Sequence, residues 1–401
     1  MTKKNKSVKN FPNLRFPEFE GEWKNKKLGE ISDIYDGTHQ TPKYTSNGVK
    51  FVSVENINDL YNTDKFISEK AFEKEYKIKP RKGDILMTRI TAGIIGATAI
   101  VQNDNPLAYY VSLALIRIKT SDNINFLSQR IETKEFKNEL HKRIIHVAFP
   151  KKINLGDIYE CSAYFPEILE QQKIASFLSL INERIQTQKK IIEKLETLMK
   201  VSRTNIFSQK LRFKNEQGYD FPNWEKLKLG EIGNFQTSSI DKLSRENENE
   251  VYLVNYMNVY RHEDINSSTI KSFQKVTAKE QQISSCNLKK GDILFTPSSE
   301  TPDDIGHSVV ISENLENAVF SYHLMRFRPE IEIDILYSHY FCNVPIVLSQ
   351  LSKFATGSTR FTISVKSFSD VEVSLPSLPE QKVIGKFISL IEHKIAIEKQ
   401  I

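Results

Sequence analysis

The chain has 401 residues, which is long enough for two or three domains, and each half could bury a core of its own. Lysine and arginine exceed aspartate and glutamate by 56 to 50, a mild basic excess that permits a polyanionic partner without requiring one. The three cysteines, Cys161, Cys286 and Cys342, have no paired spacing. This argues against disulfides and a thiolate metal site, and favours a reducing cytoplasm.

Neither the apolar run within the chain nor its first ten residues suggest a membrane protein. The richest apolar run, residues 85–101, contains Arg89 and several Thr and Gly, so we expect no membrane span. Residues 1–10 are basic and no apolar signal region follows them, so we expect a disordered tail.

A first globular unit is predicted over residues 1–165. It opens with Leu14-Arg15-Phe16, Trp23 and Leu28-Gly29-Glu30-Ile31. We expect Trp23 to anchor the core, although a base-stacking platform is the alternative.

The rest of the first unit mixes strand and helix patterns. Segments 51–54 and 111–118 are rich in β-branched and aromatic residues and predict strands, while helix is expected mostly around 124–143. Lys82-Gly83-Asp84 predicts a tight turn with Gly at positive φ, in preference to a catalytic carboxylate beside a lysine. The unit is therefore predicted to be α+β with a curved, mainly antiparallel sheet.

A long amphipathic helix is predicted from Glu170 to about Phe207, within a spacer region of residues 166–210. Apolar residues recur there at steps of three and four, and no Pro or Gly interrupts them. At about 1.5 Å per residue the helix would exceed roughly 50 Å, so its apolar seam must have a partner. The predicted seam residues are Ile174, Phe177, Ile181, Ile185, Ile192, Leu195, Met199 and Ile206.

The second half repeats the first, and a second globular unit is predicted over residues 211–375. It opens with Leu211-Arg212-Phe213, Trp224 and Leu229-Gly230-Glu231-Ile232, and later carries the turn Lys290-Gly291-Asp292. Within it, segments 251–254 and 293–295 predict strands, and helix is expected around 333–351.

A second helix is predicted over residues 376–401. Its start, Leu378-Pro379-Glu380-Gln381, echoes the start of the first helix 210 positions earlier, and Ile384, Phe387, Ile391 and Ile395 continue the apolar seam. Five such matches in the same order are not plausibly chance. Each half is therefore one copy of a globular unit followed by a long helix.

This order of parts resembles the specificity subunits of type I restriction-modification systems. The resemblance covers nearly the whole chain and rests on Trp23 with the following Leu-Gly-Glu-Ile, Thr41-Pro42, the Lys82-Gly83-Asp84 turn and the Pro-x-x-x-Glu-Gln motif before each long helix. It implies an α+β fold of two tandem α/β target-recognition domains, each followed by a long helix. The two helices would pair as an antiparallel coiled coil that serves as a spacer, leaving the beginning of the first helix, near 174–181, unpaired.

The resemblance also implies partners and a substrate. Two methyltransferase subunits would dock on the helical part, two motor-nuclease (restriction) subunits can join, and the target would be double-stranded DNA with two half-sites around a non-specified gap. A pair of similar units has a pseudo-twofold axis that can match a local dyad of the duplex. Because the units differ between their shared motifs, we expect an asymmetric target.

Base recognition is expected in surface loops that differ between the copies. Arg can bridge guanine, Asn or Gln can bridge adenine, and Lys often meets phosphate, although for each single residue a solvated surface position is the alternative. The candidates in the first unit are His39, Gln40, Thr41, Lys43, Tyr44, Arg89, Thr91, Lys151 and Lys152. Those in the second unit are Ser238, Ser239, Lys242, Arg245, Asn255, Asn258, Arg261, Thr296, Ser298, Ser358 and Arg360.

No catalytic centre is expected in this chain. Asp104-Asn105-Pro106-Leu107 lacks the Pro-Pro-aromatic sequence with which an amino-methyltransferase grips a flipped base, and no phosphate-binding loop follows a strand. We therefore expect no metal and no cofactor here, with S-adenosylmethionine, ATP and Mg²⁺ in the partner subunits. Two alternatives stay open at this point: a coiled-coil scaffold that binds proteins and no DNA, and a self-contained restriction or modifying enzyme.

Overall fold

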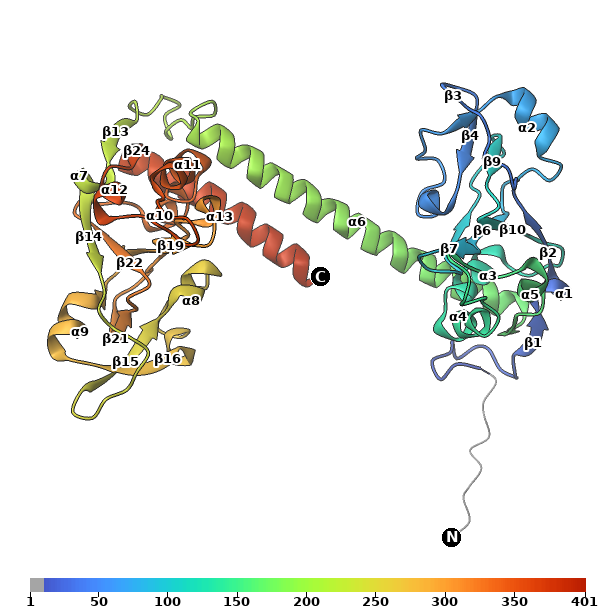
Figure 1. The fold of residues 1–401 in the computed structure, drawn as a ribbon, viewed down its shortest axis with the longest axis horizontal. Helices are drawn as coiled ribbons and strands as arrows, with labels where there is room; N and C mark the ends of the chain where they lie inside the picture. Colours follow the sequence, from blue (N-terminus) through green and yellow to red (C-terminus); the bar gives the residue numbers. More distant parts are fainter. Residues whose placement is uncertain (1–10) are drawn as a thin grey trace, which may run out of the picture. The chain divides into compact units, whose positions relative to one another are not determined.

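A computed structural model describes residues 11–401 (Figure 1). The predicted N-terminal tail lies outside the described residues. The chain divides into two compact units, the first ending at Gln186 and the second beginning at Thr187. None of the helices in residues 11–401 is long and apolar enough to span a bilayer.

The first unit contains two four-stranded sheets and two short strand pairs. One sheet is antiparallel with the order β2-β10-β6-β8, and the other has the order β3-β5-β4-β9 with β4 and β9 parallel. The strand pairs are β1-β12 and β7-β11. The strands are β1 (Lys24–Lys27), β2 (Ser32–Asp36), β3 (Tyr44–Thr45), β4 (Val49–Val52), β5 (Phe66–Ile67), β6 (Ile85–Thr88), β7 (Ile90–Thr91), β8 (Thr98–Ile100), β9 (Leu107–Tyr109), β10 (Leu113–Ile118), β11 (Lys151–Lys152) and β12 (Ser162–Phe165).

Short helices cover this framework. The predicted helix around 124–143 is two helices, because Thr133 caps a new helix by accepting a hydrogen bond from Phe136 N. The helices of the unit are α1 (Leu28–Ile31), η1 (Val54–Asn56), α2 (Glu69–Glu75), α3 (Ile124–Ile131), α4 (Lys134–His141), α5 (Leu155–Tyr159) and the first part of α6 (Ile168–Phe207).

The second unit has the same set of sheets and strand pairs as the first, with differences at the edge strands. Its antiparallel sheet has the order β14-β22-β18-β20, its mixed sheet the order β16-β15-β21-β17, and its strand pairs are β13-β24 and β19-β23. The strands are β13 (Glu225–Lys228), β14 (Gly233–Thr237), β15 (Asn249–Val254), β16 (Gln274–Ala278), β17 (Asn287–Leu288), β18 (Ile293–Phe295), β19 (Ser298–Ser299), β20 (Ser308–Val310), β21 (Leu315–Phe320), β22 (Met325–Pro329), β23 (Phe361–Thr362) and β24 (Glu372–Leu375).

The helices of the second unit follow the same order as those of the first. They are the last part of α6, α7 (Leu229–Ile232), α8 (Tyr256–Tyr260), η2 (Ile270–Ser272), α9 (Glu280–Cys286), η3 (Pro302–Asp304), α10 (Ile335–Phe341), α11 (Pro345–Phe354), α12 (Val365–Ser369) and α13 (Leu378–Gln400). The predicted repeat is thus present in the topology as well as in the sequence.

Each unit has two hydrophobic cores on opposite faces of its antiparallel sheet. In the first unit Ile85 and Met87 of β6 belong to the core under the helices, while Leu86 between them belongs to the core shared with the mixed sheet. The alternation follows from the two-residue period of a strand. A strand buried on both faces reads as a continuous apolar run, which is why 85–88 shows no polar alternation.

The Lys-Gly-Asp turns are structural, as predicted. Gly83 and Gly291 have φ of 91° and 90°, a conformation that suits glycine. The following Asp84 is buried and accepts hydrogen bonds from Arg117 Nε at 2.9 Å and Nη2 at 2.6 Å. The turn therefore delivers a carboxylate that fixes a neighbouring strand.

A buried carboxylate ties the first long helix to its globular unit. Glu170, in the first turn of α6, accepts hydrogen bonds from Arg15 Nε and Nη2, both at 2.7 Å, and from Trp23 Nε1 at 3.3 Å. Its side chain is 2% exposed. Trp23 is thus a buried core anchor, as the sequence indicated.

The second copy makes the same contacts. Glu380 accepts hydrogen bonds from Arg212 Nε at 3.1 Å and Nη2 at 2.8 Å, and from Trp224 Nε1 at 3.0 Å. The neighbouring Gln381 donates to Pro376 O and accepts from Asp334 N, both at 2.9 Å. In each copy the start of the long helix is held by a charged and an amide side chain.

In the second unit α13 lies beside the last part of α6 and runs in the opposite direction (Figure 1). Gln188 Nε2 donates to Glu398 O at 2.7 Å, Lys399 pairs with Glu196 at 2.8 Å, and Ile206 lies in the core that also contains the start of α13. This is the antiparallel helix pair that the predicted fold requires.

The predicted seam residues differ in exposure. Those toward the end of α6 and in α13 are buried or half-buried: Ile192, Leu195, Met199, Ile206, Ile384, Phe387, Ile391 and Ile395. Ile174 is half-buried, whereas Phe177, Ile181 and Ile185 are exposed by 49%, 39% and 45%. The exposed seam residues lie in the part of α6 that belongs to the first unit.

Glu170→Gln tests the buried carboxylate. Removing the charge leaves the Arg15 guanidinium without its buried counter-ion, so we expect the first unit to lose about 3 kcal/mol of unfolding free energy. The matched control is Glu167→Gln, which breaks an exposed pair with Lys24 one turn away and should leave the unfolding midpoint unchanged. Urea unfolding of the full chain measures both. Equal effects from the two variants would contradict the assigned role.

Candidate nucleic-acid interface

In the first unit a strand pair brings several predicted recognition residues together. Thr91 of β7 pairs with Lys151 of β11, and Ile90 pairs with Lys152. Both lysines are exposed. The strand pair β7-β11, called the first ladder below, therefore carries two exposed lysines at consecutive positions.

Arg89 holds this ladder to the body of the unit. It is 7% exposed, and its side chain donates from Nε to Ile153 O at 3.3 Å and from Nη1 to Val111 O at 2.9 Å. Asp36 lies 3.9 Å from Nη1, and it also pairs with the exposed His39 at 2.7 Å. Burial lowers the pKa of the Arg89 guanidinium, and the nearby Asp36 partly offsets that effect.

The second unit builds the same ladder from β19 and β23. Ser298 pairs with Thr362 and Ser299 with Phe361. Arg360, exposed just before β23, donates from Nη2 to Ser298 Oγ at 3.3 Å. Burial, together with the nearby Arg360 and Lys242, lowers the pKa of His323, so this imidazole is neutral at pH 7.

The two ladders share one backbone frame and differ in side chains. Ile153 N donates to Arg89 O at 3.0 Å, and Ile363 N donates to Pro297 O at 2.9 Å. With the offset of 210 that relates the helix starts, Lys151 and Lys152 of the first copy correspond to Phe361 and Thr362 of the second. A common scaffold thus carries basic side chains in one unit and an aromatic and a hydroxyl side chain in the other.

Most of the remaining candidates are exposed or half-buried polar groups. Exposed side chains are Gln40, Thr41, Lys43, Tyr44, Ser239, Lys242, Arg245, Arg261 and Ser358, and half-buried ones are Thr91, Ser238, Asn255 and Asn258. Some already have intramolecular partners. Asn255 caps α8 by accepting from Met257 N at 3.0 Å, and Arg245 pairs with Asp241.

Three candidates are buried, which differs from the expected surface position. Arg89 supports the ladder described above, Thr296 is fully buried, and Ser298 is 9% exposed. Their neighbours in sequence are Thr, Pro and Ser, which resemble loop composition. The contacts of Arg89 with Ile153 and of Ser298 with Thr362 join residues about 60 positions apart, so local sequence did not reveal them.

Two exposed apolar residues next to the first ladder were not among the predicted recognition residues. Val147 and Phe149 are 97% and 93% exposed and precede Lys151 by a few residues. In the second unit Tyr322 is 50% exposed beside His323. Large apolar side chains beside basic ones suit base stacking. The sequence signal that could have identified these residues was their position next to polar loop residues.

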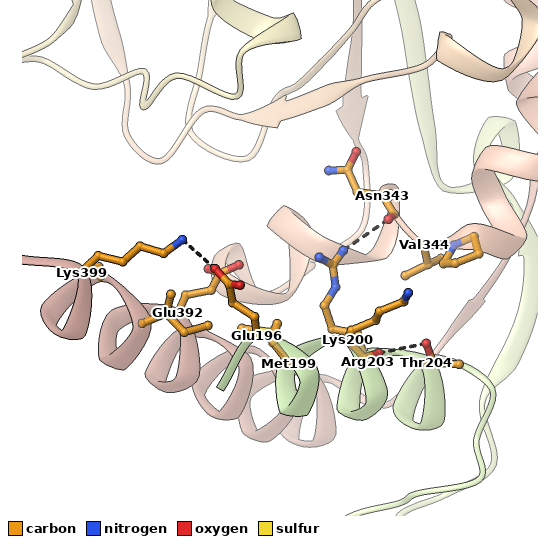
Figure 2. Close-up of a pocket in the computed structure, with 12 residues that line it drawn as sticks. Glu196, Met199, Lys200, Arg203, Thr204, Asn343, Val344, Glu392 and Lys399 are labelled. Carbon is orange, nitrogen blue, oxygen red and sulfur yellow. Dashed lines mark hydrogen bonds and ion pairs between the residues drawn. The ribbon is translucent and has the colours of Figure 1, made fainter. Parts of the chain in front are cut away.

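A pocket lies between the paired helices of the second unit (Figure 2). It has a volume of about 600 Å³, and its lining includes Met199, Arg203, Val344 and Ile395. Arg203 Nη2 donates to Asn343 O at 3.2 Å. This mixture of apolar and charged groups contains no arrangement of nucleophile, acid and base.

Comparison with known proteins identifies the family of the chain. The family model for the type I restriction modification DNA specificity domain matches residues 20–197 and again residues 222–401. The chain belongs to this family. The two matches coincide with the two copies of the repeat.

Individual relatives agree with the family assignment. The specificity subunit of the type I restriction enzyme MjaIX from Methanocaldococcus jannaschii is 24% identical over 407 residues, covering 92% of this chain and 86% of that protein. The MjaVIII specificity subunit of the same organism is 26% identical over 244 residues, covering 59% of this chain and 56% of that protein. The crystal structure of the type I S subunit from M. genitalium has a TM-score of 0.57 at 15% identity, covering 97% of this chain and 94% of that one, which shows the shared fold.

The chain is therefore a type I restriction-modification specificity subunit, and this prediction is confirmed. A specificity subunit is the DNA-recognition part of its complex, and catalysis lies in the partner modification and restriction subunits.

Replacing both Lys151 and Lys152 by alanine tests the first ladder. If they meet phosphates, the double variant should bind target DNA more weakly, and the slope of log K against log salt should become shallower by about 0.9 for each lost contact. The matched control is the double replacement of Lys70 and Lys74 by alanine on α2, which lies away from β7 (Figure 1). Fluorescence anisotropy over a salt series measures both. Identical slopes in the two variants would remove the ladder from the interface.

Proposed function

We propose that each unit of this specificity subunit reads one half-site of an asymmetric, bipartite double-stranded DNA target. The observation that carries the proposal is the shared ladder with different side chains, Lys151 and Lys152 in one copy and Phe361 and Thr362 in the other. A constant frame holds the reading positions in register, and unlike side chains select unlike bases. Two unlike readers require two unlike half-sites.

The chemistry available to each reader differs. In the first unit Lys151, Lys152, Lys43 and His39 supply donors for guanine edges and phosphates, and Phe149 supplies a stacking face. In the second unit Ser358 and Arg360 directly precede Phe361 and Thr362 in sequence, and Arg360 and Lys242 lie near His323. We expect the second half-site to depend less on lysine and more on apolar contact, for example with the methyl group of thymine.

The proposal includes the partner subunits. Two adenine-N6 methyltransferase subunits would bind along α6 and α13, and restriction subunits would join them. S-adenosylmethionine, ATP and Mg²⁺ would be bound by those subunits. The exposed apolar residues Phe177, Ile181 and Ile185 on α6 support a protein partner on this helix. The complex would work in the cytoplasm, where its DNA target lies.

Modified-base sequencing tests the proposed function directly. Cells that carry this chain with a matching methyltransferase subunit should contain N6-methyladenine in a two-part motif with a fixed gap. Cells with the methyltransferase subunit alone should lack it. A stable complex that produces no new methylation would instead favour a scaffold that binds proteins and no DNA.

Exchange of the ladder residues tests the division between the units. The double variant Lys151→Phe with Lys152→Thr should alter or abolish recognition of one half-site and leave the other half-site unchanged in the methylation motif. The reciprocal variant, Phe361→Lys with Thr362→Lys, should affect only the second half-site. A change of both half-sites by either variant would refute one reader per unit.

A further inference from the structure

Two histidines outside both ladders face each other in the second unit. His262 Nε2 and His307 Nδ1 lie 3.2 Å apart. The other ring nitrogens have fixed partners: His262 Nδ1 lies 3.2 Å from Ser308 O, and His307 Nε2 lies 2.9 Å from Asp304 Oδ1. A carbonyl or carboxylate oxygen accepts hydrogen bonds, so these two nitrogens carry the protons and donate. The nitrogens that face each other are therefore the ones that can offer lone pairs.

The outer hydrogen bonds of these two rings are of the kind that metal-binding imidazoles make. A ligating histidine usually donates its other N–H to a carboxylate or backbone carbonyl, which fixes the tautomer and the ring orientation. Two nitrogens bound to one ion at about 2.1 Å lie roughly 3.0 Å apart at octahedral and about 3.4 Å apart at tetrahedral angles. The separation of His262 Nε2 from His307 Nδ1 falls between these values.

The surroundings favour a cation. Both histidines line a cavity of about 600 Å³ whose charged lining holds five carboxylates and one guanidinium: Glu263, Asp264, Asp303, Asp304, Glu392 and Arg203. His262 is exposed, and the His307 side chain is 27% exposed, so an ion can reach both rings from solvent. A phosphate or other anion would meet a predominantly negative lining.

The backbone at His262 is unusual for a histidine. His262 has φ of 53°, and it follows α8 at the position where His262 N donates to Val259 O at 3.0 Å and Glu263 N donates to Asn258 O at 2.9 Å. This is a Schellman ending, in which the left-handed residue is most often glycine because other residues are strained there. The histidine at this position adopts the strained conformation, and its Nε2 lies against His307.

The first unit shows that the pair is no part of the common scaffold. Thr88 N donates to Ala97 O at 3.0 Å, as Thr296 N donates to His307 O at 2.9 Å. Ala97 follows Ile95-Gly96 just as His307 follows Ile305-Gly306. The fold of a unit is therefore formed without a histidine at this place.

We propose that His262 and His307 bind one divalent transition-metal ion of the zinc class, with water in the remaining coordination positions. In residues 11–401 no third His, Cys, Asp or Glu completes a metal-binding cluster with them, so the protein contributes two ligands. Each imidazole binds in its neutral form, through the nitrogen that faces the other ring. The ion links the end of α8 to the turn before β20, and so fixes the loop that carries Arg261.

Zinc titration of the full chain tests this site. Isothermal titration calorimetry after removal of metal with EDTA should show one Zn²⁺ per chain. His262→Asn keeps a residue that tolerates positive φ, and His307→Gln keeps a donor for Asp304; both should weaken binding at least 10-fold. Asp304→Asn, which disturbs the orientation of His307, should weaken it by about 10- to 100-fold.

The matched control is His146→Gln. His146 also lies against a second histidine, His141, with ring centroids 4.4 Å apart, but its Nε2 contacts the His141 carbonyl oxygen at 3.1 Å. Zinc should bind this variant as it binds the unaltered chain and should raise the Tm of both, while leaving the Tm of His262→Asn and His307→Gln unchanged. Absence of saturable binding, or equal binding by the chain with and without His262 and His307, would overturn the proposal.

Discussion

The buried carboxylate at the start of each long helix is the contact on which this architecture depends. Glu170 and Glu380 each accept two hydrogen bonds from an arginine and one from a tryptophan that opens the same globular unit. A charge in a site this dry is stable only when all its partners are in place. Each helix is therefore fixed to the opening segment of its own globular unit.

Duplication separates what the fold needs from what recognition needs. The carboxylate site, the Lys-Gly-Asp turn and the short ladder recur in both units with the same backbone contacts. Side chains on the ladder differ, as Lys151 and Phe361 do. The two units can therefore be compared within one chain. A contact present in both units belongs to the shared scaffold, whereas a contact present in only one unit serves that unit alone.

The sequence predicted the parts of this structure that have local or repeated patterns. The helix from Glu170 to Phe207, the two copies and the turns at Gly83 and Gly291 follow from periodicity, spacing and the demands of positive φ. Burial of Arg89 was not predictable, because the strand that covers it lies about 60 residues away. The same holds for His262 and His307, which are 45 residues apart and meet only when α8 ends beside β20.

Exposure of Phe177, Ile181 and Ile185 has a consequence for the life of this subunit in the cell. An apolar stripe on a helix attracts chaperones and proteases for as long as it stays uncovered. If the proposed methyltransferase subunit covers the stripe, the chain without that subunit would be the form that proteases remove more readily.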